Sequence, residues 1–144
     1  MSSASTTNIL NRLLALHARS LPKYLDFAPP DKLAANSQVK VVLDQIVADH
    51  KRTVDRLGTL ILDGNGLPET GEWPMAFTGL HDLSAEYLVG LLVERQERFV
   101  PACERLADQL TLAPYAQDVA REIVGEAKGH LENLQDLLPE KTAA

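Results

Sequence analysis

The stretch LPETGEWPMAFTGLH, residues 67–81, decides whether the chain forms one continuous run of helices or two separate helical pairs. It contains two prolines and two glycines, and its apolar residues do not recur with the period of a helix. A connection of this length is too long for a simple turn between neighbouring antiparallel helices. We therefore expect it to cross over the molecule and to join two helical hairpins.

On both sides of this crossover, apolar residues recur at intervals of three and four, which predicts amphipathic helices. Pro29 and Pro30 stop the first helix, and DGNG at 63–66 ends the second with glycines suited to a left-handed cap. The predicted helices are 7–28, 33–63, 83–111 and 114–138, with 64–82 as the crossover. No segment alternates with the period of a strand, so the predicted fold is all-α, an antiparallel four-helix bundle with one long crossover.

Two prolines lie inside the predicted helices, Pro22 in the first and Pro101 in the third. Each removes a backbone hydrogen bond from the helix. We therefore expect both helices to bend at these positions.

Length and composition limit the class of protein. The 144 residues predict a single domain, 1–144, with flexible ends at 1–6 and 139–144. A net charge of −6 argues against nucleic-acid binding, and no apolar run is long enough to span a membrane. The N-terminus lacks the features of a signal peptide, and the single Cys103 cannot form an internal disulfide. These features predict a cytoplasmic protein in which Cys103 is packed rather than reactive.

The two halves of the chain resemble each other at an offset of 77 residues. ADHKRTVDRL at 48–57 then aligns with GEAKGHLENL at 125–134, so that Asp49 matches Glu126 and Thr53 matches His130. The same offset aligns His17 with Glu94, although these residues belong to the other helix of each hairpin. A constant offset over both helix pairs favours an internal duplication.

Several polar residues lie on or beside the apolar stripes of these helices. In EIVGEAKGHLENL, residues 122–134, Glu126 precedes His130 by about one helical turn. Either these residues form a functional site, or each has an ordinary structural role. A histidine on an apolar stripe is commonly a core residue with a hydrogen-bond partner. Asp49 and Glu126 could be solvated charges, and Glu94 could pair with Arg98, a contact worth only about 0.3 kcal/mol.

The stretches LNRLLALHARSLPKYL (10–25) and DHKRTVDRLGTLILDGNG (49–66), together with the crossover, give residues 7–138 a resemblance to the ferritin-like superfamily. The resemblance implies a glutamate from the first and third helices and a glutamate–histidine pair from the second and fourth. In that family these side chains enclose two iron or manganese ions.

Carried over residue by residue, the resemblance implies a degraded two-metal site. Glu126 and His130 match the paired motif, at an interval of four residues where the family has three. His17 stands where a glutamate is expected and Thr53 where a histidine is expected. Asp49 could replace the remaining glutamate, and His50 could compensate for the missing histidine. The candidate metal ligands are Glu94, Glu126, His130, His17, His50 and Asp49.

The favoured hypothesis is therefore a non-catalytic bundle with a structural or interaction role, which needs no cofactor. The alternative is a metalloprotein that binds iron or manganese at low occupancy and has weak oxidase or peroxide chemistry. Acids that point inward must be paired, protonated or metal-bound, and protonation of the three helix histidines could balance them. Four histidines are too few for a hemerythrin-like oxygen-binding site.

Two apolar segments bear on partners. The run Leu88, Val89, Leu91, Leu92 and Val93 is too wide for one helix seam and predicts a homodimer or higher oligomer. Trp73, Pro74, Met75 and Phe77 are expected to pin the crossover across the bundle, and the alternative is a surface for a partner.

Overall fold

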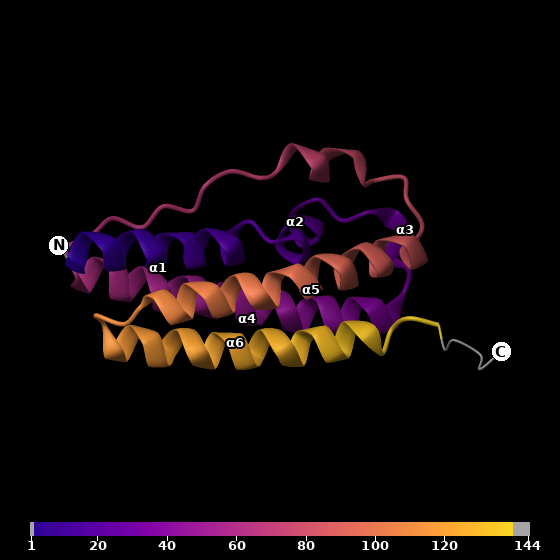
Figure 1. Cartoon of the computed structure of the whole chain (residues 1–144). Helices are drawn as coiled ribbons and strands as arrows, with labels where there is room; N and C mark the ends of the chain where they lie inside the picture. The colour runs from indigo at the N-terminus through magenta and orange to yellow at the C-terminus, as the bar shows by residue number, and fades with distance from the viewer. Residues whose placement is uncertain (1, 140–144) are drawn as a thin grey trace.

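The computed structural model describes residues 2–139, and within this range the chain is all-helical, without strands. The predicted all-α class is confirmed. The helices are α1 (Ser2–Ala18), α2 (Leu21–Phe27), α3 (Asp31–Ala34), α4 (Ser37–Asp63), α5 (Ala85–Gln109) and α6 (Pro114–Gln135), with a 3-10 helix, η1 (Met75–Gly79), in the crossover. The four longest helices, α1, α4, α5 and α6, lie side by side, and the crossover arches past α1 and α2 (Figure 1).

The helices associate mainly in two pairs. α1 packs against α4 and α5 packs against α6, while contacts of α1 with α5 and of α4 with α6 join the pairs. Each of the four longest helices buries an apolar stripe; that of α4 runs through Val39, Leu43, Ile46, Leu57 and Ile61. The stripe of α4 is interrupted between Ile46 and Leu57 by buried polar residues.

These polar residues separate two apolar clusters. One cluster gathers around Leu13 and Leu57, and the other around Leu25 and Leu88. Each of the four long helices contributes buried or half-buried polar side chains to the region between the two clusters. We call this set the polar layer; its members are His17, Asp49, His50, Thr53, Gln96, Glu126 and His130.

The first predicted helix is broken in two, which corrects the expected range 7–28. α1 ends at Ala18, and Ser20 takes an extended conformation (φ −71°, ψ 158°) as the N-cap of α2. The Ser20 hydroxyl accepts a hydrogen bond of 3.4 Å from the Lys23 amide. Pro22 therefore lies in the first turn of a new helix, where its missing N–H costs nothing, and does not bend a continuous one. In contrast, α5 runs through Pro101.

Other helix boundaries differ because of local capping. The second long helix begins at Ser37 and not at 33, since the Asn36 side chain accepts a hydrogen bond of 3.1 Å from the Val39 amide and caps α4. At its end the left-handed residue is Asn65 (φ 66°), so the glycines of DGNG do not provide the predicted left-handed conformation. α5 begins at Ala85 and α6 ends at Gln135, each within three residues of prediction.

At the ends of the chain, the segment 1–6 that we expected to be flexible is helical from Ser2. The other expected flexible segment, 139–144, lies outside the described residues except for position 139. None of the described helices is both long and apolar enough to cross a lipid bilayer.

The crossover is pinned to the helices, as expected. Asn11 holds its first part, because its amide donates to the Leu67 carbonyl (3.0 Å) and its oxygen accepts from the Glu69 amide (2.7 Å). Further on, Phe77 is only 1% exposed, and Trp73 stacks on Phe27 with a centroid distance of 5.8 Å. Met75 does not take part, since it is 84% exposed.

The apolar run on α5 is covered within the chain. Leu88, Val89, Leu92 and Val93 are buried in the second apolar cluster, and Leu91 packs against it. The surplus apolar strip from which we predicted an oligomer is therefore not exposed. Homo-oligomerisation stays a prediction that needs another surface.

Candidate metal and polar site

The centre of the polar layer is formed by α4 and α6. Asp49, Glu126 and His130 each offer one ligand atom, and these three atoms lie within 4.8 Å of one another. His130 Nε2 lies 3.1 Å from Asp49 Oδ2 and 4.0 Å from Glu126 Oε1. The sequence offset of 77 residues therefore identified two acids, Asp49 and Glu126, that meet in space.

The short distance between His130 and Asp49 is not a hydrogen bond. The two atoms are close enough for one, but their alignment is poor, so that His130 Nε2 has no hydrogen-bond partner in the described part of the chain. A buried ring nitrogen without a partner is uncommon. It is free to bind a water molecule or a cation.

A cation of the chain already occupies the outer side of this group. The Arg52 guanidinium donates to Asp49 Oδ1 at 2.8 Å and to Glu126 Oε2 at 3.2 Å, and so bridges α4 and α6. Gln45 Nε2 lies 3.3 Å from both carboxylate oxygens of Asp49. The Arg52 side chain is 65% exposed and contacts the largely buried Asp49, so it lies on the solvent side of the site. Sequence reasoning missed Arg52, although its position three residues after Asp49 places it on the same face of α4.

The two carboxylates influence each other. Burial raises the pKa of Glu126 above its ordinary value of 4.5, and the charge of Asp49 raises it further. Arg52 opposes both effects through its charge and its hydrogen bond. The site therefore collects negative charge that favours a nearby cation, and Arg52 supplies one.

Three histidines extend the polar layer towards α1. The rings of His17 and His50 are 4.9 Å apart, and those of His50 and His130 are 6.0 Å apart. His17 Nδ1 donates to the Leu13 carbonyl at 2.8 Å, and His50 Nδ1 lies 2.8 Å from the Ser20 hydroxyl. His50 Nε2 has no partner among the described residues.

These histidines do not balance the acids by protonation, which corrects our expectation. Burial lowers the pKa of His17 from 6.5 to about 4, although its bond to Leu13 acts in the other direction. Burial also lowers the pKa of His50 well below 6.5, and that of His130 below 6.5 against the opposing charge of Asp49. These lowered pKa values favour neutral imidazoles at pH 7, and Arg52 is the cation that contacts both carboxylates.

Glu94 lies outside the site, contrary to prediction. Its side chain is 65% exposed and pairs with Arg98 at 3.3 Å, the ordinary surface contact of residues four apart. The buried polar residue of α5 is Gln96, which donates to the Ala127 carbonyl of α6 at 3.0 Å. The spacing of Gln96 to the buried Leu92 and Cys103 was the available signal, because the three share one helix face.

Two oxygen donors and one nitrogen donor suit a single iron or manganese ion. The residues do not fit two ions, because Thr53 is a poor ligand and Glu94 points to solvent. In the comparisons with known proteins, no family model, curated protein or solved structure matches this chain. The functional proposal therefore depends on the geometry of the polar layer.

Proposed function

We propose that the chain is an antiparallel four-helix bundle of the ferritin-like type that has lost the two-metal centre and has a structural or interaction role without catalysis. The pairing of α1 with α4 and of α5 with α6, joined by a long crossover, supports this architecture. The polar layer lies where facing helices of such bundles present their metal ligands.

The observation that carries the proposal is the position of Arg52. Its guanidinium contacts one oxygen of Asp49 and one of Glu126. The chain therefore supplies its own cation to the two carboxylates that would otherwise bind a metal ion. The arrangement joins α4 to α6 through ionic hydrogen bonds, which fix helix register even where they add little stability. On this account the polar layer specifies the packing of the bundle.

The same residues favour a second candidate, the binding of one iron or manganese ion. Asp49, Glu126 and His130 supply a compact donor set, and His130 Nε2 has no hydrogen-bond partner within residues 2–139. Arg52 is mostly exposed, so it can leave the carboxylates without disturbing the core. An ion bound there would supply weak oxidase or peroxide chemistry.

Titration with manganese distinguishes the two candidates. We expect weak binding to the unmodified protein, and binding roughly tenfold or more tighter to Arg52→Gln, because a charge-assisted contact to each carboxylate is removed. Adding His130→Ala should abolish the gain. The matched control is Arg56→Gln on the same helix, which removes an equal charge from a surface pair with Glu122.

Each result decides between the candidates. Tighter manganese binding by Arg52→Gln but not by Arg56→Gln supports the first candidate, in which Arg52 holds the two carboxylates. Tight binding of one manganese ion by the unmodified protein would replace the first candidate with the second. An equal gain in Arg56→Gln would show that net charge, and not the site, controls the affinity.

A further inference from the structure

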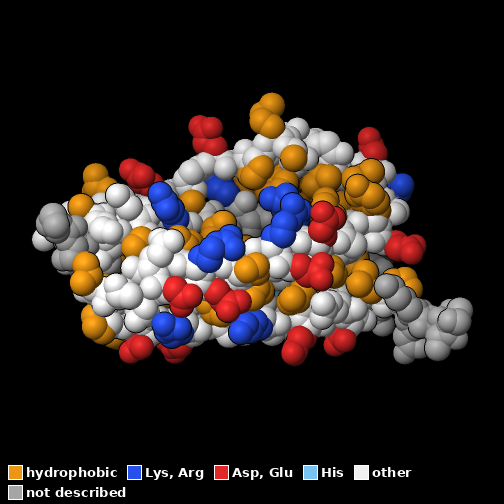
Figure 2. Space-filling model, in the orientation of Figure 1, with side chains coloured by type: hydrophobic (Ala, Val, Ile, Leu, Met, Phe, Trp, Pro, Cys, Tyr) orange, Lys and Arg blue, Asp and Glu red, His pale blue; other side chains and the backbone are white. Residues whose placement is uncertain are grey.

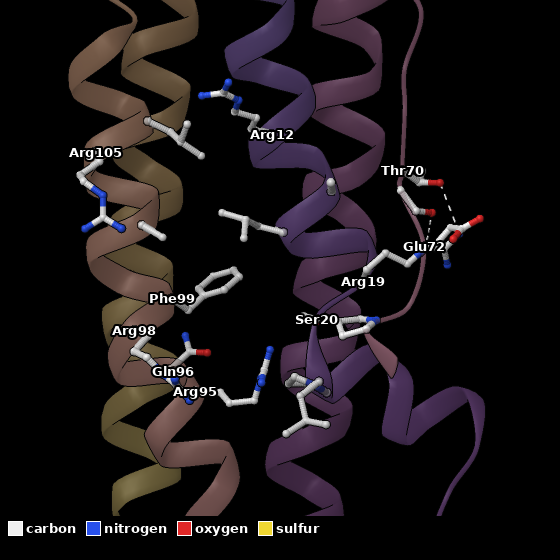
Figure 3. Close-up of a pocket in the computed structure, with 18 of the residues that line it drawn as sticks. Arg12, Arg19, Ser20, Thr70, Glu72, Arg95, Gln96, Arg98, Phe99 and Arg105 are labelled. Carbon is white, nitrogen blue, oxygen red and sulfur yellow. Dashed lines mark hydrogen bonds between the residues drawn. The ribbon is translucent and has the colours of Figure 1, made fainter. Parts of the chain in front are cut away.

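A second feature lies on another face of the molecule, between α1, α5 and the crossover. It is a solvent-open groove with a cavity volume of about 810 Å³. This volume lies within the range of about 300 to 1,000 Å³ that small-molecule sites have. Figure 2 shows basic side chains gathered around a hollow on this face, and Figure 3 shows the residues that line it. We call it the arginine groove.

The groove collects positive charge on a protein whose net charge is −6. Arg12 lines it from α1, Arg19 lines it from the turn that follows α1, and Arg95, Arg98 and Arg105 line it from α5. Spacings of three and seven residues place the three arginines of α5 on one face of that helix. Glu72 is the single acidic residue among those that line the groove.

Not all of these arginines are engaged. Arg19 donates to the Gly71 carbonyl at 3.0 Å and lies over the Trp73 ring, and Arg98 pairs with Glu94 outside the groove. The other three, Arg12, Arg95 and Arg105, have no acidic partner within 4.0 Å among residues 2–139.

Arg95 is the half-buried member of these three arginines. Its guanidinium lies 4.7 Å from the Phe77 ring centroid. Burial lowers the pKa of Arg95, and the neighbouring charge of Arg98 lowers it further, while the charge of Glu94 acts in the other direction. Arg95 itself has no carboxylate partner among the residues that the structure describes, so an anion in the groove would favour its charged form.

The floor of the groove is apolar and firmly held. Phe99 points into the space between α1 and α5 (Figure 3), and Leu16 and Leu106 line the same floor. Phe99 packs against the rings of His17 and His50 at centroid distances of 4.9 and 5.5 Å. An occupant of the groove therefore meets an apolar floor that includes the aromatic ring of Phe99, with guanidinium groups beside it.

We propose that the arginine groove binds an organic phosphate of the nucleotide class, with its phosphates on the free guanidinium groups and its planar body against Phe99. Guanidinium groups bind phosphate oxygens through paired, planar hydrogen bonds. Arg95 and Arg105 are ten residues apart on α5, which corresponds to about 15 Å along a helix, so one extended molecule can reach both. The proposal is independent of metal binding in the polar layer.

Calorimetric titration at low salt tests this proposal with three probes: ATP, inorganic pyrophosphate and adenosine. We expect ATP to bind at least roughly tenfold tighter than either fragment, because only ATP uses both the guanidinium groups and the floor. Arg95→Gln combined with Arg105→Gln should weaken ATP binding by roughly tenfold or more. Circular dichroism verifies that the variants are folded.

The matched control combines Arg56→Gln with Arg121→Gln, two exposed arginines outside the groove that pair with Glu122 and Asp108. It removes the same charge and should leave ATP binding nearly unchanged. Absence of ATP binding, or equal weakening by the control, would overturn the proposal. Pyrophosphate binding as tightly as ATP would refute the role of the floor, and adenosine binding as tightly as ATP would refute the role of the arginines.

Discussion

Replacing His17 by leucine is expected to make the protein less sensitive to acid. His17 is 1% exposed, and its pKa is lowered from 6.5 to about 4, mainly by burial. In the unfolded chain the same imidazole takes up a proton near pH 6.5. Between pH 6.5 and pH 4 the unfolded state therefore binds more protons than the folded state, and stability falls as the pH falls through this window.

The size of the effect follows from the two pKa values. For His17, the difference between 6.5 and about 4 lowers the unfolding free energy by about 3 kcal/mol in total once the pH is below the folded-state pKa. About 2 kcal/mol of this loss falls between pH 7.5 and pH 5. The lowered pKa values of His50 and His130, both caused by burial, add to the loss. Glu126 acts in the opposite direction, because its raised pKa lets the folded state take up a proton first.

The assay is urea unfolding, followed by far-UV circular dichroism, of the unmodified protein and His17→Leu at both pH values. The difference in unfolding free energy between the two proteins should shift by about 2 kcal/mol in favour of the variant on going to pH 5. His81→Gln is the control, since it replaces an imidazole at an exposed position and leaves the three buried ones in place. A difference that is the same at pH 7.5 and pH 5 would refute the assignment of His17 as a buried neutral residue.

Three further predictions concern packing and assembly. Gly66→Ala should lower the unfolding free energy by about 1–3 kcal/mol in thermal denaturation, because the added Cβ would lie 2.6 Å from Thr7 Cγ2; an unchanged melting temperature would contradict the close contact. Cys103 is fully buried and its pKa is raised to about 12 by burial, so a thiol reagent should modify it only in the unfolded protein. A homodimer or higher oligomer is still predicted, with the exposed Phe27 and Met75 as its contact surface in place of the covered run on α5, and a monomeric mass by light scattering at micromolar concentration would reject it.

The parts of the fold that sequence reasoning predicted correctly follow from periodicity and breakers. Apolar spacing located the four long helical stretches, and Pro114 marked the first residue of α6. The break after Ala18 was missed because the signal there is a serine cap, and a proline two residues later fits the start of a helix as well as a bend. Local hydrogen bonds of this kind compete with helix continuation and leave no trace in the apolar period.

For the site, the sequence predicted positions better than partners. The positions of His17, His50 and His130 on apolar stripes predicted that they point inward, as they do. The offset of 77 residues paired Asp49 with Glu126, and the two carboxylates lie close together in the structure. Arg52 could not be predicted in the same way, because a long, exposed side chain reaches its partners through rotamers that the helix period does not determine.

The two remaining errors have different causes. Glu94 and Gln96 differ by two residues, a rotation of about 200° on a helix, so they lie on nearly opposite faces, and the family pattern that requires a carboxylate selected the surface acid in place of the buried amide. The protonation state of the histidines depends on complete burial, which only the packed structure shows.

The central claim is that the polar layer does not form a two-metal centre. The most direct measurement is the iron and manganese content of protein purified without chelator and then supplied with iron in air. The account predicts no more than one ion per chain and no oxygen consumption typical of a two-iron site, because Arg52 balances Asp49 and Glu126 while Glu94 lies at the surface. Two irons bound per chain, with oxygen consumed as iron is added, would contradict it.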